Sequence, residues 1–312
     1  MTTGPSRDAD PKATLIGLLA VLLWSSVVGL IKSVSESFGA TAGAALIYTL
    51  AAVILLPMLG RGGLRNFPRR YLLWGGALFV GYELCLSLSI GYSQTARQAI
   101  EVGMVNYLWP TFTLVAAIMF NGQKASWLVV PGFVISILGI GGVLGGDQGL
   151  DLASMAGNVR HNPLSYGLAF VGAVLWAAYC VVTPRTANGR NGVALFFALT
   201  AMTLWIKLAL GGDGRVTLDP GALVTLVLAA AAMGLGYAAW NVGILRGNVT
   251  VLATASYFTP VFSAALAALL LQSPLPLTFW QGAALVCVGS IVCWLATRQR
   301  APRAAQEMER PG

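Results

Sequence analysis

One acidic residue, Glu83, interrupts a long apolar stretch of the sequence, where it follows Tyr82 and precedes Leu84. A carboxylate is costly to remove from water, so a residue of this kind usually faces a cavity or a partner group. Glu83 could therefore contact the ammonium group of a substrate, or carry a proton. The alternative is a structural role, in which the carboxyl is protonated or paired with Arg97.

Two prolines, Pro110 and Pro260, each lie near the centre of an apolar segment. Proline lacks the N–H that bonds the carbonyl four residues earlier, so both are expected to kink a helix. The carbonyls set free are those of Asn106 and Ser256. In an apolar environment they need another partner, which could be water or a substrate ammonium in a cavity, or a neighbouring helix.

Aromatic residues also lie within the apolar segments, Trp24 among them, where their N–H and O–H groups need partners. A cavity walled by such rings would stack on an aromatic substrate or hold a cation against the ring faces. Ordinary helix packing is the alternative. The residues that we expect to line the cavity, beside Glu83, are Tyr82, Asn106, Tyr107, Trp109, Trp176, Tyr179, Tyr237, Trp240, Asn241 and Tyr257.

No combination of residues predicts catalysis or a bound cofactor. His161 is the only histidine, and all four cysteines lie in apolar runs, so no metal-ligand set is available. The sequence has no phosphate-binding Walker loop, no nucleophile elbow and no dinucleotide fingerprint. A membrane enzyme acting on lipids would need a nucleophile with its base, or metal ligands. We therefore expect neither an enzyme nor a cofactor.

The composition indicates that these residues are held by helices in a membrane. Hydrophobic residues make up 57% of the 312 residues and charged residues only 10%, whereas soluble domains carry about 25% charged residues. Mean hydropathy is +0.75. The net charge of +8 is spread over short gaps and tails, which argues against nucleic acid as a partner.

Ten apolar segments are each long enough to cross a bilayer as a helix, which takes about 20 residues. This predicts an all-α polytopic membrane protein with ten transmembrane helices. Basic residues favour the cytoplasmic side. With both termini inside, fourteen of the nineteen lysines and arginines are cytoplasmic. The predicted segments are 14–31, 41–59, 71–91, 100–120, 127–146, 164–183, 192–210, 221–243, 249–271 and 277–296.

The two halves of the chain resemble each other at an offset of 150–155 residues. Five spans per half is an odd number, so the second half would enter the membrane from the opposite face. Inverted repeats of this kind are typical of secondary transporters with a substrate site between the halves. The matching stretches are 20–26 with 172–178, 81–82 with 236–237, and 106–112 with 256–262; Gly132 and Gly139 match Gly282 and Gly289.

This organisation divides the chain into five parts. Residues 14–146 and 164–296 form the two five-helix repeats, joined by an external linker at 147–163. Residues 1–13 and 297–312 form cytoplasmic tails. We expect a monomer in the lipid bilayer. The pairs Gly141 with Gly145 and Gly142 with Gly146, which allow close helix contact, leave a dimer as the alternative.

Ten spans in a five-plus-five repeat resemble the drug/metabolite transporter superfamily of EamA type over nearly the whole chain. The stretch EVGMVNYLWPT at 101–111 is similar to the aromatic amino acid exporter branch of that superfamily. The resemblance implies a bacterial inner-membrane exporter of phenylalanine, tyrosine and tryptophan that works by alternating access. The alternative within transport is a multidrug exporter for aromatic cations, neutralised by Glu83. A passive channel is a further alternative.

Overall fold

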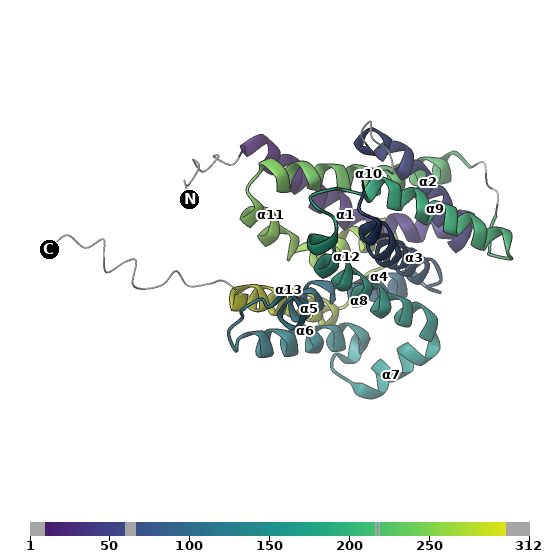
Figure 1. Cartoon of the computed structure of the whole chain (residues 1–312). Helices are drawn as coiled ribbons and strands as arrows, with labels where there is room; N and C mark the ends of the chain where they lie inside the picture. The colour runs from purple at the N-terminus through teal and green to yellow at the C-terminus, as the bar shows by residue number, and fades with distance from the viewer. Residues whose placement is uncertain (1–9, 60–66, 216, 218, 298–312) are drawn as a thin grey trace, which may run out of the picture.

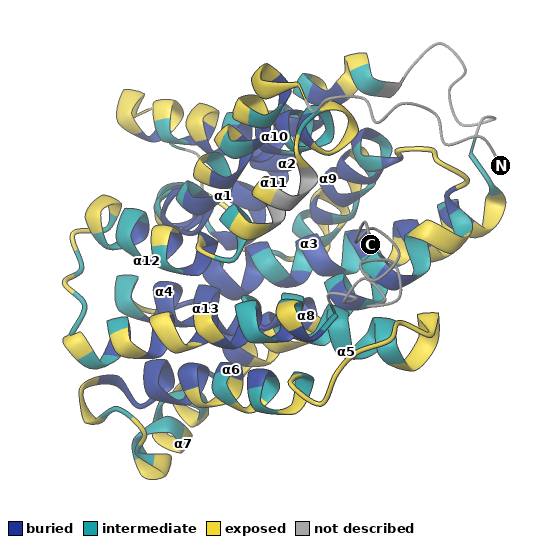
Figure 2. Ribbon diagram, turned by 90° about the vertical axis from the view of Figure 1, so that its left-hand side faces the viewer, coloured by how far each residue is buried: buried dark blue, intermediate teal, exposed yellow. Residues whose placement is uncertain are grey.

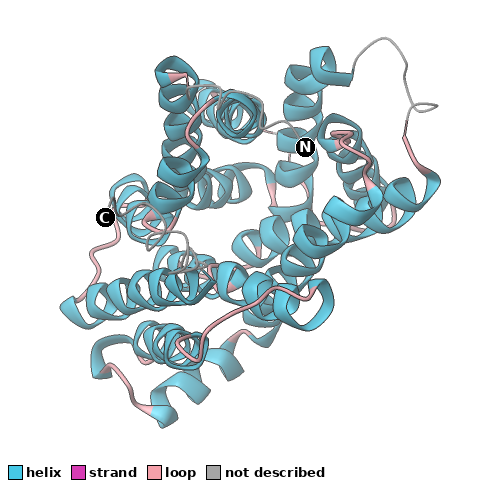
Figure 3. Ribbon diagram, turned by 60° about the vertical axis from the view of Figure 1, so that its left-hand side comes forward, coloured by secondary structure: helices cyan, strands magenta, loops and turns pink. Residues whose placement is uncertain are grey.

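The computed structural model describes residues 10–59, 67–215, 217 and 219–297, and all regular structure in these ranges is helical (Figure 3). Most of both tails, together with Arg61 and Arg65, lies outside the described residues. The α-helices are α1 (Pro11–Phe38), α2 (Ala40–Leu55), α3 (Gly76–Gly91), α4 (Ala96–Asn106), α5 (Trp109–Asn121), α6 (Val129–Leu144), α7 (Leu152–His161), α8 (Pro163–Thr186), α9 (Val193–Ala209), α10 (Pro220–Arg246), α11 (Val249–Ser256), α12 (Thr259–Leu270) and α13 (Leu277–Thr297).

Short helices of other types complete the fold. Two 3-10 turns, η1 (Leu56–Leu59) and η4 (Gly146–Gln148), follow α2 and α6, and a π-helical turn, η3 (Tyr71–Gly75), precedes α3. Seven described helical segments are long and apolar enough to cross a membrane, and three more apolar helices are shorter: Val129–Leu144, Val193–Ala209 and Thr259–Leu270. The chain is therefore an all-helical, multi-pass membrane protein, as its composition predicts.

Two of the predicted spans are interrupted near their centres. α4 ends at Asn106, a turn follows at Tyr107 and Leu108, and α5 begins with Pro110 in its first turn. In that turn the Tyr107 N–H donates to the Met104 carbonyl at 3.0 Å, three residues back instead of four. α11 and α12 are separated in the same way, ahead of Pro260. The sequence predicted a kink in one continuous helix, whereas the structure has two helices at each place.

This difference follows from the chemistry of proline. Its ring fixes its own backbone angle and crowds the residue before it, and it has no N–H to donate. The first turn of a helix tolerates all of these properties. A short turn followed by a new helix therefore costs less than a proline in the interior of one helix.

Helices from the two halves of the chain pack against each other in antiparallel pairs. Near one end of α1, the Asp10 N–H donates to the Arg246 carbonyl at 3.0 Å, and further along α1 the Trp24 ring lies against Gly236 of α10. α3 packs on α8, α2 on α9, and α6 on α13 (Figure 1). Buried residues face these contacts, while exposed apolar residues lie on the outer surfaces (Figure 2).

Glycines allow a close contact between α6 and α13. A Cβ atom added at Gly139 would lie 2.7 Å from the carbonyl oxygen of Gly282, and one added at Gly282 would lie 2.7 Å from that of Gly139. Gly132 and Gly289 meet in the same way, with a Cβ at Gly289 2.7 Å from the Gly132 carbonyl. These are the four glycines matched by the sequence repeat, so each helix meets its counterpart from the other half.

The linker between the halves contains a helix that the sequence did not predict. α7 begins after Asp151, whose side chain accepts a hydrogen bond from the Ser154 N–H at 2.7 Å. Met155 and Val159 pack against the hydrophobic core, although no residue of α7 is fully buried. α7 lies at the lower edge of the bundle in Figure 1. It joins the two halves as an ordered element.

Candidate functional site

Glu83 lies at the centre of the fold and is 0% exposed. Its carboxylate accepts one hydrogen bond from the Tyr48 hydroxyl at 2.7 Å and another from the Tyr237 hydroxyl at 2.7 Å. Tyr48 belongs to α2 and Tyr237 to α10, so one carboxylate connects three helices and both halves of the chain. The burial cost of the acid is offset by these two donors.

Arg97, which the sequence analysis considered as an ion-pair partner of Glu83, pairs with other residues. Its guanidinium donates to Glu101 at 3.2 Å and to Asp147 at 3.0 Å. The second oxygen of Glu101 accepts from the Tyr166 hydroxyl at 2.7 Å. These contacts form a separate polar network that links α4, η4 and α8.

Aromatic rings surround Glu83, and Trp176 of α8 is central among them. The Trp176 ring centroid lies 4.5 Å from that of Tyr82, 5.2 Å from Tyr179 and 6.4 Å from Tyr237. Trp109 meets its edge at 6.2 Å. The structure therefore brings together rings from α3, α5, α8 and α10 that the sequence predicted to share a site.

A second set of rings continues this cluster on the side of α1. Trp24 lies 5.1 Å from Tyr237 and 5.3 Å from Trp240, measured between ring centroids. Phe197 of α9 packs edge-on against Tyr237 at 5.1 Å. We call the aromatic cluster the set of rings around Glu83, namely Trp24, Tyr48, Phe79, Tyr82, Trp109, Trp176, Tyr179, Phe197, Tyr237 and Trp240.

The predicted polar residues lie beside this cluster. Asn106, 4% exposed, points its amide toward the Ala169 carbonyl at 3.5 Å and borders Gly172 of α8. Tyr107 shares a hydrogen bond with Ser263 of α12. Asn241 is half-buried and follows Trp240 on α10. Asn106 and Tyr107 therefore connect the interrupted fourth span to the second half.

Tyr257 packs against a helix that contributes no ring to the aromatic cluster. Its ring lies 6.2 Å from that of Trp294 on α13, and no ring contact with the aromatic cluster is described for it. Tyr107, its counterpart in the repeat, packs against the buried core. Pro260 is buried and Pro110 half-buried, each in the first turn of its helix. The two tyrosines occupy matching positions of the repeat, but the helices around them differ.

Four members of the aromatic cluster were not among the predicted site residues: Trp24, Tyr48, Phe79 and Phe197. Tyr48 carries a signal that the sequence could have provided, since it is a lone tyrosine inside an apolar run, like Tyr82. Phe79 and Phe197 are both 0% exposed, yet they have no polar atom to distinguish them from phenylalanines that face lipid. Trp24 was recognised as a residue within a span but was left out of the cavity.

A cavity of about 460 Å³ lies away from Glu83, where the end of α2 near Gly39 meets the end of α9 and the loop that follows it. Phe38, Leu46 and Trp205 form part of its apolar wall. At the aromatic cluster, by contrast, ring packs on ring, with centroid distances from 4.5 to 6.4 Å. The rings of the aromatic cluster therefore pack directly on one another.

At the same end of the molecule, Asp213 in the loop after α9 forms hydrogen bonds to the start of α2. Its carboxylate accepts from the Ala40 N–H at 2.5 Å, the Thr41 N–H at 3.2 Å and the Thr41 hydroxyl at 2.6 Å. Asp213 thus caps the N-terminus of α2 from the other half of the chain. Burial raises the pKa of this carboxyl, but the hydrogen bonds from Thr41 and Ala40 lower the pKa by more, so it lies below its ordinary value.

We expect Asp213→Ala to lower the free energy of unfolding by about 1 kcal/mol at neutral pH, the usual cost of losing a helix cap. Because the folded-state pKa is depressed, this contribution is present above the ordinary pKa of about 4 and is lost as the pH falls through the lower folded value. Thermal unfolding of the purified parent and variant, at neutral pH and at a pH below the folded-state pKa, measures the difference in stability. A difference that stays the same in acid would show that the carboxylate charge is not involved.

Comparison with known proteins places this architecture in a family. The model of the EamA-like transporter family matches the chain twice, at residues 11–145 and 163–295. A protein of Salmonella typhimurium (strain 14028s / SGSC 2262) called "Aromatic amino acid exporter YddG" is 55% identical over 289 residues, covering 93% of this chain and 99% of that protein. A protein of the same name from Escherichia coli (strain K12) is 54% identical over 92% of this chain and 98% of its own.

One solved crystal structure has the same fold. It superposes with a TM-score of 0.64 at 22% sequence identity and covers 96% of this chain and 99% of its own. The family resemblance inferred from the sequence is confirmed, and the family is one of transporters and not of enzymes. The double match also shows that the domain is duplicated. This chain belongs to the EamA-like transporter family.

Proposed function

We propose that this protein exports aromatic amino acids across a bacterial inner membrane by alternating access. The observation that carries the proposal is Glu83, a lone carboxylate held by two tyrosines within the aromatic cluster, where both halves of the chain meet. Relatives that are 54–55% identical over most of the chain carry the name of aromatic amino acid exporters. Rings to stack on an aromatic side chain and an acceptor for an ammonium are what such a substrate needs.

In this proposal the substrate ring inserts among Tyr82, Trp176 and Tyr237, and its ammonium takes a place at Glu83. The two tyrosine hydroxyls hold the carboxylate while the site is closed, and the ammonium replaces at least one of them when substrate binds. The remaining residues proposed to line the site are Asn106, Tyr107, Trp109, Tyr179, Trp240 and Asn241. Tyr257 is left out because its ring packs on Trp294.

The proposed topology is ten spans in two inverted five-helix halves, residues 14–146 and 164–296, with the linker 147–163 outside and the tails 1–13 and 297–312 inside. Its support is the antiparallel packing of counterpart helices, α2 with α9 and α6 with α13. The start of α1 and the end of α13 lie at the same side of the bundle (Figure 1). The two ends of a chain lie on the same side of a membrane when the number of crossings is even, as it is with ten spans.

We expect a cysteine at Ser154 to react with a membrane-impermeant maleimide added to intact cells, because α7 lies outside in this topology. A cysteine at the exposed Lys124, between α5 and α6, should react only after the cells are opened. Of the native cysteines, three are buried and Cys180 is half-buried, so the parent should give a low background. The reverse labelling pattern would show that the protein has the opposite orientation in the membrane.

Counterflow in proteoliposomes tests the transport proposal. Labelled phenylalanine is added outside vesicles loaded with one unlabelled compound, and its uptake is followed. Acceleration by internal tyrosine, tryptophan or phenylalanine, but not by a small aliphatic amino acid, is the expected result. Flux that neither saturates nor accelerates would indicate a passive channel instead.

A multidrug exporter for aromatic cations is the second candidate, because Glu83 and the surrounding rings would also suit a cation. The same vesicles loaded with an aromatic quaternary ammonium compound discriminate the two functions. A zwitterionic aromatic amino acid should accelerate uptake of labelled phenylalanine and the quaternary cation should not. Acceleration by the cation alone would favour the drug exporter.

A further inference from the structure

Trp24 joins the aromatic cluster from α1, where it packs against Tyr237. Its ring packs edge-on against Tyr237 at 5.1 Å and at a tilt against Trp240 at 5.3 Å. The Tyr237 hydroxyl in turn donates to Glu83. Trp24 and Glu83 therefore contact the same tyrosine, one at its ring and the other at its hydroxyl.

The indole nitrogen of Trp24 is buried and has no hydrogen-bond partner among the residues that the structure describes. A Cβ atom added at Gly236 would lie only 2.7 Å from this nitrogen, so the N–H edge lies directly against the backbone of α10, where there is no side chain to accept from it. Buried tryptophan N–H groups usually have a partner, and an exception calls for a physical explanation. An acceptor supplied by a ligand would provide one.

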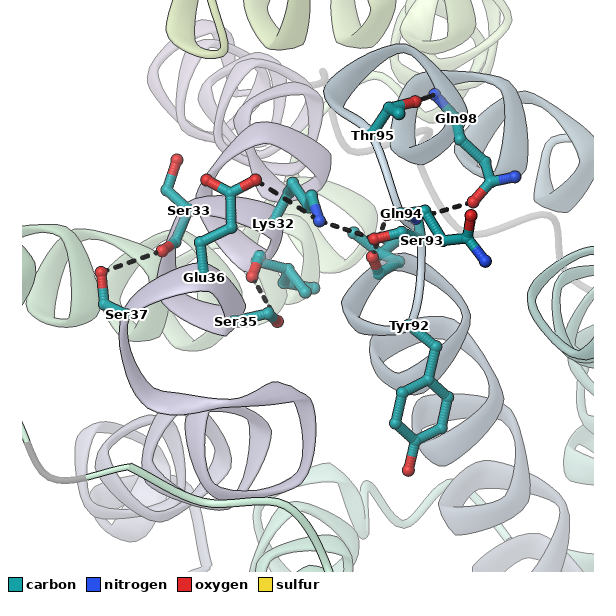
Figure 4. Close-up of polar contacts among 12 residues, drawn as sticks. Lys32, Ser33, Ser35, Glu36, Ser37, Tyr92, Ser93, Gln94, Thr95 and Gln98 are labelled. Carbon is teal, nitrogen blue, oxygen red and sulfur yellow. Dashed lines mark hydrogen bonds and ion pairs between the residues drawn. The ribbon is translucent and has the colours of Figure 1, made fainter. Parts of the chain in front are cut away.

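A zwitterionic amino acid brings such an acceptor in its carboxylate. Glu83 suits the ammonium but repels the carboxylate, which needs a donor or a cation. The nearest lysine along α1 is Lys32, two turns beyond Trp24, and it is already engaged. Its ammonium donates to the Ser93 carbonyl at 2.7 Å and lies 3.4 Å from Glu36 (Figure 4).

We propose that Trp24 Nε1 forms the carboxylate subsite of the transporter and donates its hydrogen bond to the substrate carboxylate while Glu83 takes the ammonium. This inference rests on the proposed export of aromatic amino acids. The N–H edge becomes accessible when α1 withdraws from Gly236 on α10, a separation that alternating access between the two halves would supply. The subsite selects substrates that carry a carboxylate over amines with the same ring.

The test compares L-phenylalanine with phenethylamine, which has the same ring and ammonium but no carboxylate. Binding of both labelled compounds to the purified full-length protein is measured by equilibrium dialysis, in the parent and in Trp24→Phe. Phenylalanine keeps an apolar aromatic ring at this position but lacks the N–H donor, and its ring is smaller, so the phenethylamine measurement reports the effect of the lost ring packing. We expect Trp24→Phe to bind L-phenylalanine about tenfold more weakly, as for a lost hydrogen bond to a charged group, and to bind phenethylamine within twofold of the parent.

Trp74→Phe is the matched control, because Trp74 is 59% exposed and lies in the π-helical turn before α3, outside the aromatic cluster. It should leave both affinities unchanged. Equal weakening of both ligands in Trp24→Phe would overturn the proposal in favour of ring packing, and so would no weakening of either. The parent provides a measurement independent of any variant: it should bind L-phenylalanine more tightly than phenethylamine, and equal affinities would overturn the subsite. Failure of the parent to bind L-phenylalanine would contradict the proposed function itself.

Discussion

Glu83→Gln should leave the protein folded and remove most of its transport activity. Glutamine has nearly the same shape, and its side-chain oxygen can still accept from Tyr48 or Tyr237, which both bond to Glu83 at 2.7 Å. It has no negative charge to offer an ammonium. Hydrogen bonds to charged groups contribute about 1.5–3 kcal/mol, which corresponds to roughly ten- to hundredfold in affinity. The concentration of phenylalanine at half-maximal counterflow should rise accordingly.

Tyr48→Phe is the informative comparison for this experiment. It removes one donor to the carboxylate and keeps the charge, so substrate binding should survive even if the substrate-free arrangement becomes less stable. Glu101→Gln controls for the loss of a buried carboxylate elsewhere, because Glu101 belongs to the separate network with Arg97 and Tyr166. Counterflow by Glu83→Gln equal to that of the parent would assign Glu83 a purely structural role.

Trp176→Ala should have the second large effect, on both stability and transport. The Trp176 ring touches five other rings, with centroid distances of 4.5–6.4 Å. Truncating a well-packed large side chain costs about 3 kcal/mol, because the surrounding atoms lose their contacts and relax only partly. The apparent melting temperature in detergent should fall clearly, and counterflow of aromatic amino acids should be lost.

Two further variants separate packing from substrate recognition. Trp176→Phe retains part of the ring contact and should recover most of the stability, while substrate affinity stays reduced. Tyr257→Ala removes a tyrosine that packs on Trp294, outside the aromatic cluster, and should change counterflow little. Loss of transport in Tyr257→Ala as large as that in Trp176→Ala would mean that the substrate site extends to α11 and α13.

The sequence predicted the helical membrane architecture, the duplication and the family, because each depends on a property that is carried along the chain. A composition with 10% charged residues cannot provide a water-exposed surface, and apolar runs of about 20 residues indicate spans wherever they occur. Glu83 was identifiable for the same reason. A carboxylate inside an apolar run needs a special environment whatever its neighbours are.

Local chain chemistry was harder to predict in detail. Pro110 and Pro260 predicted that two helices are interrupted. Whether a proline bends one helix or begins another depends on the turn before it. The helix α7 was also missed, since its sequence has few apolar residues. Its cap at Asp151 is a local hydrogen bond, but its contacts through Met155 and Val159 form only against the assembled bundle.

The composition of the site, in contrast, was decided by tertiary structure. Tyr48 and Phe197 come from spans that no sequence pattern placed at the centre, whereas Tyr257, which was expected to line the cavity, packs against Trp294. Likewise Arg97 bonds Glu101 and not Glu83. The physical reason is that helices which are apolar on all sides have no periodic pattern to tell which face meets a neighbour and which meets lipid. Only the packing of the two halves determines which side chains converge on Glu83.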